Sequence, residues 1–165
     1  MKISDLIDYA ATPQEVFVML ADEGFQNRKC EATGALRHTV SIQEQDGRTI
    51  IMCTRDMPSD GFPAFVKNMV GETLAVAETQ DWGPPGRDGA RSGRLTVDIP
   101  GAPLGLTGDL SLAPGGQGSL ETIEGDLKAN VPMLGRKIEE AAAPAIRSAI
   151  RVESETGAAW LATQK

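Results

Sequence analysis

Two side chains in the sequence could together perform acid–base chemistry, namely His38 and Glu78. His38 is the only histidine, and imidazole readily exchanges a proton near neutral pH. Glu78 shares its alternation with Leu74 and Val76, so a strand there would turn its carboxyl inward, where burial raises the pKa. Two interpretations stay open: an acid–base pair facing one cavity, or a hydrogen-bonded strand histidine and a carboxylate that a bulge turns to solvent.

The two cysteines are weaker candidates for chemistry. A nucleophilic thiol needs a neighbouring base and an electropositive setting. Cys53 sits beside Ile51 in a predicted strand and has no such neighbour, whereas Cys30 follows Arg28 and Lys29, which could lower its pKa, but is expected in a loop. Two cysteines make no disulfide framework, so the prediction is reduced, unreactive thiols in a cytoplasmic protein.

The motifs that bind cofactors and metals are missing from the sequence. The glycines of residues 86–93 do not end in Gly-Lys-Ser/Thr, and those of residues 101–108 precede no predicted helix, so neither stretch is a phosphate or dinucleotide motif. A single histidine without cysteines or carboxylates at ligand spacing does not make a zinc site. No G-x-S-x-G nucleophile motif is present. We therefore predict no cofactor, no metal and no assignable catalytic residue.

Composition limits the partners. The 165 residues carry 16 basic and 23 acidic side chains, a net charge of −7, which disfavours both nucleic acid and an anionic membrane surface. No apolar run approaches the roughly 20 residues of a membrane span, so no stable membrane insertion is expected. The length suits one domain over residues 1–165. Oligomeric state has no signature in the sequence.

The elements that must position these side chains are mostly strands. Period-two alternation predicts about seven antiparallel strands, at residues 3–10, 36–42, 48–56, 72–82, 91–99, 106–112 and 119–131. Asp46-Gly47 predicts a tight hairpin. Thr12-Pro13-Gln14-Glu15 predicts a capped helix start, and Phe25 a second short turn of helix. Residues 62–70 predict a short helix or a lid-like crossing.

A long amphipathic helix is predicted at residues 134–162. Its apolar arc would contain Leu134, Ile138, Ala141, Ala142, Ala145, Ala149, Val152 and Trp160. We expect this alanine-rich arc to pack on the concave face of the sheet. Pro144 lies on the polar side and predicts a bend rather than a break.

This order of elements resembles the helix-grip fold of the START and polyketide-cyclase-like (SRPBCC) superfamily. Several stretches also resemble an uncharacterised family of unknown function, found largely in actinobacteria: Tyr9-Ala10-Ala11, residues 62–66, Glu78-Thr79 up to Trp82, and residues 131–139. The resemblance implies an α+β fold, in which a curved antiparallel sheet wraps a long C-terminal helix. It also implies a pocket between sheet and helix that often holds an apolar ligand. The superfamily includes lipid carriers, cyclases and hydrolases, so activity does not follow from membership.

The predicted function is binding of a small hydrophobic or amphipathic molecule, lipid-like or polyketide-like, in that cavity without catalysis. The alternatives are a cyclase- or hydrolase-type enzyme acting in the same cavity, and a non-catalytic protein-interaction module. Methionines near the predicted cavity mouth could adapt to variable apolar shapes, or could simply fill the core. The predicted ligand-binding residues are His38, Val40, Met52, Met57, Phe62, Phe65, Met69, Val76, Glu78, Val97, Leu110, Leu127, Ile138, Ala142, Ala145 and Ala149.

Overall fold

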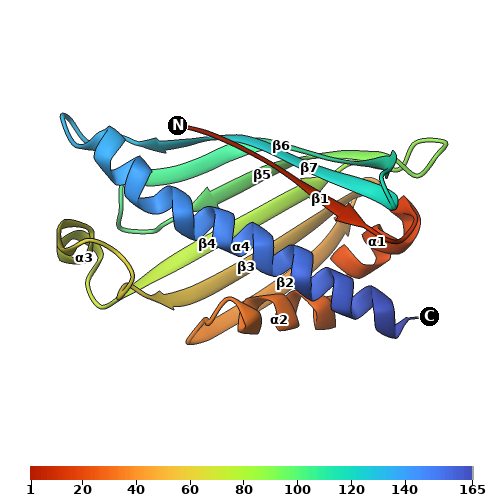
Figure 1. The fold of residues 1–165 in the computed structure, drawn as a ribbon, viewed down its shortest axis with the longest axis horizontal. Helices are drawn as coiled ribbons and strands as arrows, with labels where there is room; N and C mark the ends of the chain where they lie inside the picture. Colours follow the sequence, from red (N-terminus) through yellow and green to blue (C-terminus); the bar gives the residue numbers. More distant parts are fainter. Residues whose placement is uncertain (165) are drawn as a thin grey trace.

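The computed structural model describes residues 1–164 and consists of one curved sheet that wraps a long helix (Figure 1). The elements are β1 (Lys2–Tyr9), α1 (Pro13–Leu20), α2 (Glu23–Ala32), β2 (Arg37–Gln45), β3 (Arg48–Pro58), α3 (Ala64–Val70), β4 (Thr73–Trp82), β5 (Arg91–Asp98), β6 (Leu104–Gly115), β7 (Gly118–Ala129) and α4 (Gly135–Thr163). The seven strands run antiparallel in the order β1-β7-β6-β5-β4-β3-β2. The predicted α+β helix-grip fold is confirmed.

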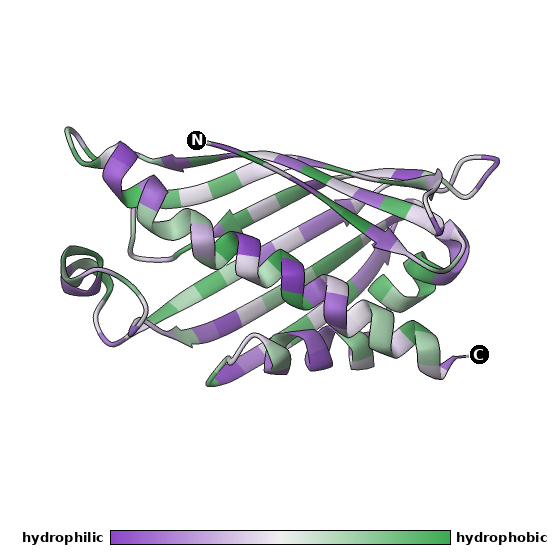
Figure 2. Ribbon diagram, viewed as in Figure 1, coloured by the Kyte–Doolittle hydropathy of each residue, from purple (hydrophilic) through white to green (hydrophobic). Residues whose placement is uncertain are grey.

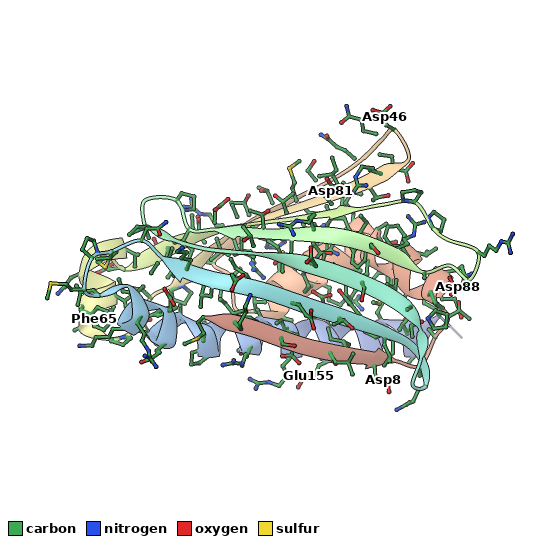
Figure 3. All side chains as sticks on the ribbon, turned by 90° about the horizontal axis from the view of Figure 1, so that it is seen from above. Asp8, Asp46, Phe65, Asp81, Asp88 and Glu155 are labelled. Carbon is green, nitrogen blue, oxygen red and sulfur yellow. The ribbon has the colours of Figure 1, made fainter. Side chains whose placement is uncertain are left out.

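Alternation of apolar side chains makes the sheet two-faced, and alternating bands are seen along several strands in Figure 2. On β6, Leu106, Leu110 and Leu112 are all buried on the concave face. The β2–β3 hairpin turns at Asp46 and Gly47, which both have positive φ, as a type I′ turn requires. Asp46 marks the tip of this hairpin in Figure 3.

The two helices after β1 are set by their caps. Thr12 Oγ1 accepts a hydrogen bond from the Glu15 amide, and the Glu15 carboxylate accepts one from the Thr12 amide, so the predicted capping box is present. Asp22 caps α2 in the same manner through the Phe25 amide. The short turn expected near Phe25 is therefore a ten-residue helix. Cys30 lies on its buried side, not in a loop as predicted.

Helix α4 crosses the concave face of the sheet as one continuous element (Figure 1). Pro144 lies within it and is exposed, and the helix continues past this residue. A Cβ added at Gly157 would lie 2.6 Å from the Tyr9 ring, so only glycine lets α4 approach β1 this closely. The buried helix residues are Ile138, Ala142, Ala143, Glu153, Gly157 and Leu161.

The inward face of α4 is rotated from the predicted arc. Leu134 precedes the helix and is 45% exposed, and Ala145 is also exposed. Ile146 and Glu153 instead face the sheet, because the inward line proceeds in steps of three and four residues from Ile138. The predicted arc was based largely on alanines, which are small enough to be tolerated on either side of a helix and therefore do not define its inward face.

The short helices lie at the two ends of the sheet. In Figure 1, α1 lies at one end, and α3 stands alone at the other. Helix α2 packs against both β2 and α4. Phe17 of α1 contacts Trp82 of β4 edge-on, and Phe25 of α2 contacts Trp160 of α4 in the same way. Aromatic contacts thus hold α1 and α2 against the rest of the fold at this end of the curved sheet.

Candidate ligand cavity

A cavity of about 510 Å³ lies between the concave face of the sheet and α4. Strands β3 to β7 form its floor, and the middle turns of α4 form its roof. Most of its wall is aliphatic, including Leu95, Leu106, Leu110 and Ile123. Its volume lies within the range of pockets that take drug-sized molecules.

Ten of the sixteen predicted ligand-binding residues line this cavity: Met57, Phe62, Val76, Glu78, Val97, Leu110, Leu127, Ala142, Ala145 and Ala149. Ala145 does so while exposed, which places it at the rim. Met69 and Ile138 line a second hollow of about 30 Å³ beside α3, together with Phe62 and Ala142.

The other four predicted residues lie outside both hollows. His38 hydrogen-bonds through Nε2 to Asn27 Oδ1 at 3.1 Å, and Val40 packs against the core nearby. Met52 alternates with the buried Ile51 and Cys53, so it lies on the other face of β3. Phe65 stands at the α3 end of the molecule, beneath the Lys137 ammonium (Figure 3).

A cluster of charged side chains, contributed by five elements, lines one part of the cavity. Lys29 of α2 is almost fully buried, and its Nζ lies 3.1 Å from Glu78 Oε1 of β4 and 3.4 Å from Glu153 Oε2 of α4. Arg55 of β3 donates through Nη2 to Glu78 Oε2 at 3.2 Å. Glu121 of β7 completes the cluster. We call Lys29, Arg55, Glu78, Glu121 and Glu153 the charged cluster.

Neighbouring amide and indole groups fix the orientation of Glu78. Trp82 Nε1 donates to Gln80 Oε1 at 2.9 Å, which leaves the Gln80 amide nitrogen to donate to Glu78 Oε1 at 3.0 Å. Glu78 therefore accepts hydrogen bonds from Lys29, Arg55 and Gln80. Both carboxylate oxygens are thus held by donors, two on Oε1 and one on Oε2.

The electrostatics of Lys29 and Glu78 favour their charged forms. Burial alone would raise the pKa of Glu78, but the charges of Lys29 and Arg55 outweigh it and lower this pKa to about 2. Burial alone would lower the pKa of Lys29, and the charges of Glu78 and Glu153 outweigh it and raise this pKa above its usual range. The two residues form a locked ion pair.

The pKa of Glu121 is shifted in the direction opposite to that of Glu78. Glu121 is fully buried, and burial, the charge of Glu153 and a hydrogen bond with Glu153 raise its pKa well above the usual range. Among the described residues, neither Glu121 oxygen nor Glu153 Oε1 has a donor when both groups are ionised. A proton on Glu121 supplies that donor, and the raised pKa of Glu121 favours this protonated form. Burial and the nearby carboxylates likewise raise the pKa of Tyr9.

Of the two interpretations left open for His38 and Glu78, the acid–base pair does not occur, because His38 bonds Asn27 outside the cavity while Glu78 lies inside. Sequence reasoning missed the other members of the charged cluster. Two of them follow from strand alternation: Arg55 has the parity of Ile51 and Cys53, and Glu121 has that of Ile123. Lys29 lies four residues after the buried Phe25 on α2, which places both on one helix face.

Both cysteines are buried free thiols next to this cluster. Cys53 donates to Gln26 Oε1 at 3.5 Å, and the Gln26 amide donates to the Leu20 carbonyl. The interaction between the two thiols lowers the pKa of Cys30 and raises that of Cys53. Within residues 1–164, no group of three or more His, Cys, Asp or Glu side chains is arranged to hold a metal ion.

A curved sheet that grips a helix over a cavity defines the helix-grip class of folds. The structure matches the Zhui aromatase/cyclase from Streptomyces sp. R1128 with a TM-score of 0.60 and 11% identity, covering 96% of this chain and 92% of that one. It matches Ara h 8.0201 with a TM-score of 0.56 and 10% identity, covering 95% and 97% of the two chains. At these identities the likeness concerns the fold.

Within that class, the chain belongs to the family described as protein of unknown function (DUF2505), whose model matches residues 6–161. A relative in Mycobacterium tuberculosis, the uncharacterized protein Rv0481c, is 24% identical over 118 residues, which are 70% of this chain and 67% of that protein. Among the described residues, no helix combines the length and apolar character needed to cross a membrane.

Proposed function

We propose that this protein binds a small hydrophobic or amphipathic molecule in the cavity between the sheet and α4, without catalysis. The observation that carries the proposal is an unfilled aliphatic cavity of about 510 Å³ with a charged cluster in its wall. A protein-interaction module would fill this space with its own side chains. The fold that this chain shares with an aromatase/cyclase also supports a small-molecule site.

The absence of catalysis is inferred from the state of the charged groups. Lys29 stays protonated and paired, so it is a poor nucleophile, and Glu78 has too low a pKa to donate a proton at neutral pH. His38 does not line the cavity. Binding requires none of these groups to exchange protons.

One observation favours a cyclase- or hydrolase-type enzyme as the second candidate. Glu121 is a buried carboxyl in the cavity wall, and its raised pKa favours the protonated form that a general acid needs. An enzyme would use Glu121 as the acid on a molecule held against β7.

A blocking variant tests binding. Val97 lines the cavity near the end of β5, so the bulkier side chain of Val97→Phe should obstruct it and abolish binding. Thr96→Phe is the matched control, because Thr96 lies on the other face of the same strand. Small molecules co-purified with each protein are extracted and identified by mass spectrometry. Equal recovery from Val97→Phe and the unmodified protein would contradict the proposal.

The extracted molecule then separates the two candidates. It is returned to ligand-free protein, incubated and analysed again. A binding protein returns it unchanged, whereas an enzyme converts it, and Glu121→Gln would abolish the conversion.

The remaining expectations are part of this proposal. The net charge of −7 supports a function without nucleic acid, and the two free thiols support a cytoplasmic location. The proposed unit is one domain over residues 1–165, of which Lys165 lies outside the described residues.

A further inference from the structure

The charged cluster and the aliphatic wall occupy different parts of the cavity. Five aliphatic or aromatic residues, Phe62, Leu74, Ile99, Leu104 and Ala142, line both the main cavity and the small hollow beside α3. None of the charged cluster lines that hollow, so the part next to α3 is apolar and the cluster lies away from it. An elongated ligand would thus place its apolar part toward α3 and any polar head at the cluster.

The ion pairs of the cluster balance one another. Lys29 and Arg55 supply two positive charges, and Glu78 and Glu153 supply two negative ones, at distances of 3.1 to 3.4 Å. A proton held between Glu121 and the unpartnered Glu153 Oε1 brings the sum to zero. A ligand with a carboxylate head would meet two cations that already have carboxylate partners. A ligand with an ammonium head would meet two carboxylates that already have cationic partners. Burying an unpaired charge among such groups is strongly unfavourable.

Hydrogen-bonding capacity nevertheless remains unused in the cavity wall. Apart from a proton held between Glu121 and Glu153, the Glu121 oxygens have no partner among the described residues, and Arg55 Nε has no acceptor there. Glu121 is fully buried and, like Arg55, is one of the residues that line the cavity. An uncharged group that both donates and accepts suits this wall: it can donate to the free carboxyl oxygen of Glu121, and its own oxygen can accept from a donor such as Arg55 Nε.

We propose that the ligand of this cavity is an apolar molecule with an uncharged hydroxyl head, an alcohol or a phenol, which hydrogen-bonds to Glu121 beside Arg55. The inference rests on the proposed binding function and adds the chemical class of the ligand to it. Fatty acids and amines of the same size are the classes that the balanced cluster rejects.

Three probes with the same ten-carbon chain test the head group. 1-Decanol, decanoate and decylammonium are titrated into the ligand-free protein at pH 7 by isothermal titration calorimetry. We expect 1-decanol to bind at least about tenfold more tightly than either ion, the loss expected when one hydrogen bond is replaced by an unpaired charge. Decanoate or decylammonium binding as tightly as 1-decanol would overturn the inference.

Variants of β7 locate the head. Glu121→Leu removes the hydrogen bond and should weaken 1-decanol binding about tenfold, while Glu121→Gln, which keeps a donor and an acceptor, should recover most of that loss. Glu124→Leu is the control, because Glu124 is exposed on the outer face of the same strand. Unchanged binding in Glu121→Leu, with folding verified by circular dichroism, would overturn the proposed head position.

The same titrations separate this inference from the proposed function. If a charged probe binds best and Val97→Phe abolishes that binding, the cavity binds ligands but the hydroxyl head is wrong. If no probe binds and no molecule co-purifies with the protein, the binding function itself fails, and the inference with it.

Discussion

The two ends of the cavity are built on different principles. At the end away from α3, side chains from α2, β3, β4, β7 and α4 converge on one charged cluster, and each ion pair joins two elements. At the other end, α3 covers an apolar hollow, and Val66 is the only buried residue of that helix among those described. The first end gains directional specificity from fixed polar groups, and the second gains tolerance of shape.

The contrast extends to the backbone. Helix α3 has seven residues and no side-chain hydrogen bond at its N-cap, and Gly71 at its end has a φ of 86°. Helix α2, at the charged end, has ten residues and an Asp22 cap. The apolar end is therefore the part of the cavity wall with the weaker local support.

The largest expected effect comes from breaking the charged cluster. Lys29→Met leaves the buried carboxylates of Glu78 and Glu153 without their shared cation, and should reduce the free energy of unfolding by about 3–5 kcal/mol. Urea denaturation followed by circular dichroism measures the change. Lys67→Met is the control, because Lys67 lies 3.7 Å from an exposed Asp60 and its surface pair contributes little. An equal urea midpoint for Lys29→Met and the unmodified protein would show that the cluster does not stabilise the fold.

The second largest effect concerns the difference in local stability between α3 and the central strands. Backbone amides of α3 should exchange with deuterium at least about a hundredfold faster than those of β6 and β7, because α3 has little buried surface. Hydrogen exchange with mass spectrometry resolves the two regions. Protection of α3 equal to that of the central strands would mean that the apolar end is as rigid as the charged one.

A smaller effect concerns the proton on Glu121. Its pKa in the folded state is raised above the ordinary value of 4.5, so the folded protein keeps a proton that the unfolded chain releases. This contribution is complete below pH 4.5 and is lost as pH rises toward the folded pKa. Relative to Glu121→Gln, the unmodified protein should lose stability as pH rises above 5, by at most about 1.4 kcal/mol per pH unit.

Urea titrations of both proteins at several pH values measure this difference. The low pKa of Glu78 acts in the opposite direction, since its stabilisation is lost as pH falls from 4.5 to about 2. Glu78 is present in both proteins, so the comparison isolates Glu121. A difference that stays constant with pH would show that Glu121 is ionised in the fold.

The smallest effect is expected at His38. His38→Ala removes the hydrogen bond to Asn27 and should cost about 1 kcal/mol or less in unfolding free energy. Binding of 1-decanol should not change, because His38 lies outside the cavity. A tenfold or greater loss of affinity would show that His38 does contribute to ligand binding.

The sequence predicted the strands well because burial on one face imposes a period of two, and Glu78 was correctly placed inward by this rule. The same alternation places Arg55 and Glu121 on the inward face, although their charge argued against a buried position. The meeting of Lys29 with Glu78 and Glu153 could not be derived, because it depends on the packing of α2 and α4 across the sheet. The inward face of α4 was predicted wrongly because residue type is misleading at two positions. Ala145 is apolar but exposed, and Glu153 is charged but buried.

The order of the sheet also has a consequence for how the chain folds. Strand β1, at the start of the chain, pairs with β7, so that Ile3 lies opposite Gly125. On the ribosome, β1 must therefore wait until nearly the whole sheet has been synthesised, while the neighbouring strands β2 to β7 can pair in succession. Such distant pairing slows folding. We expect refolding in milliseconds to seconds, with the edge formed by β1 joining last.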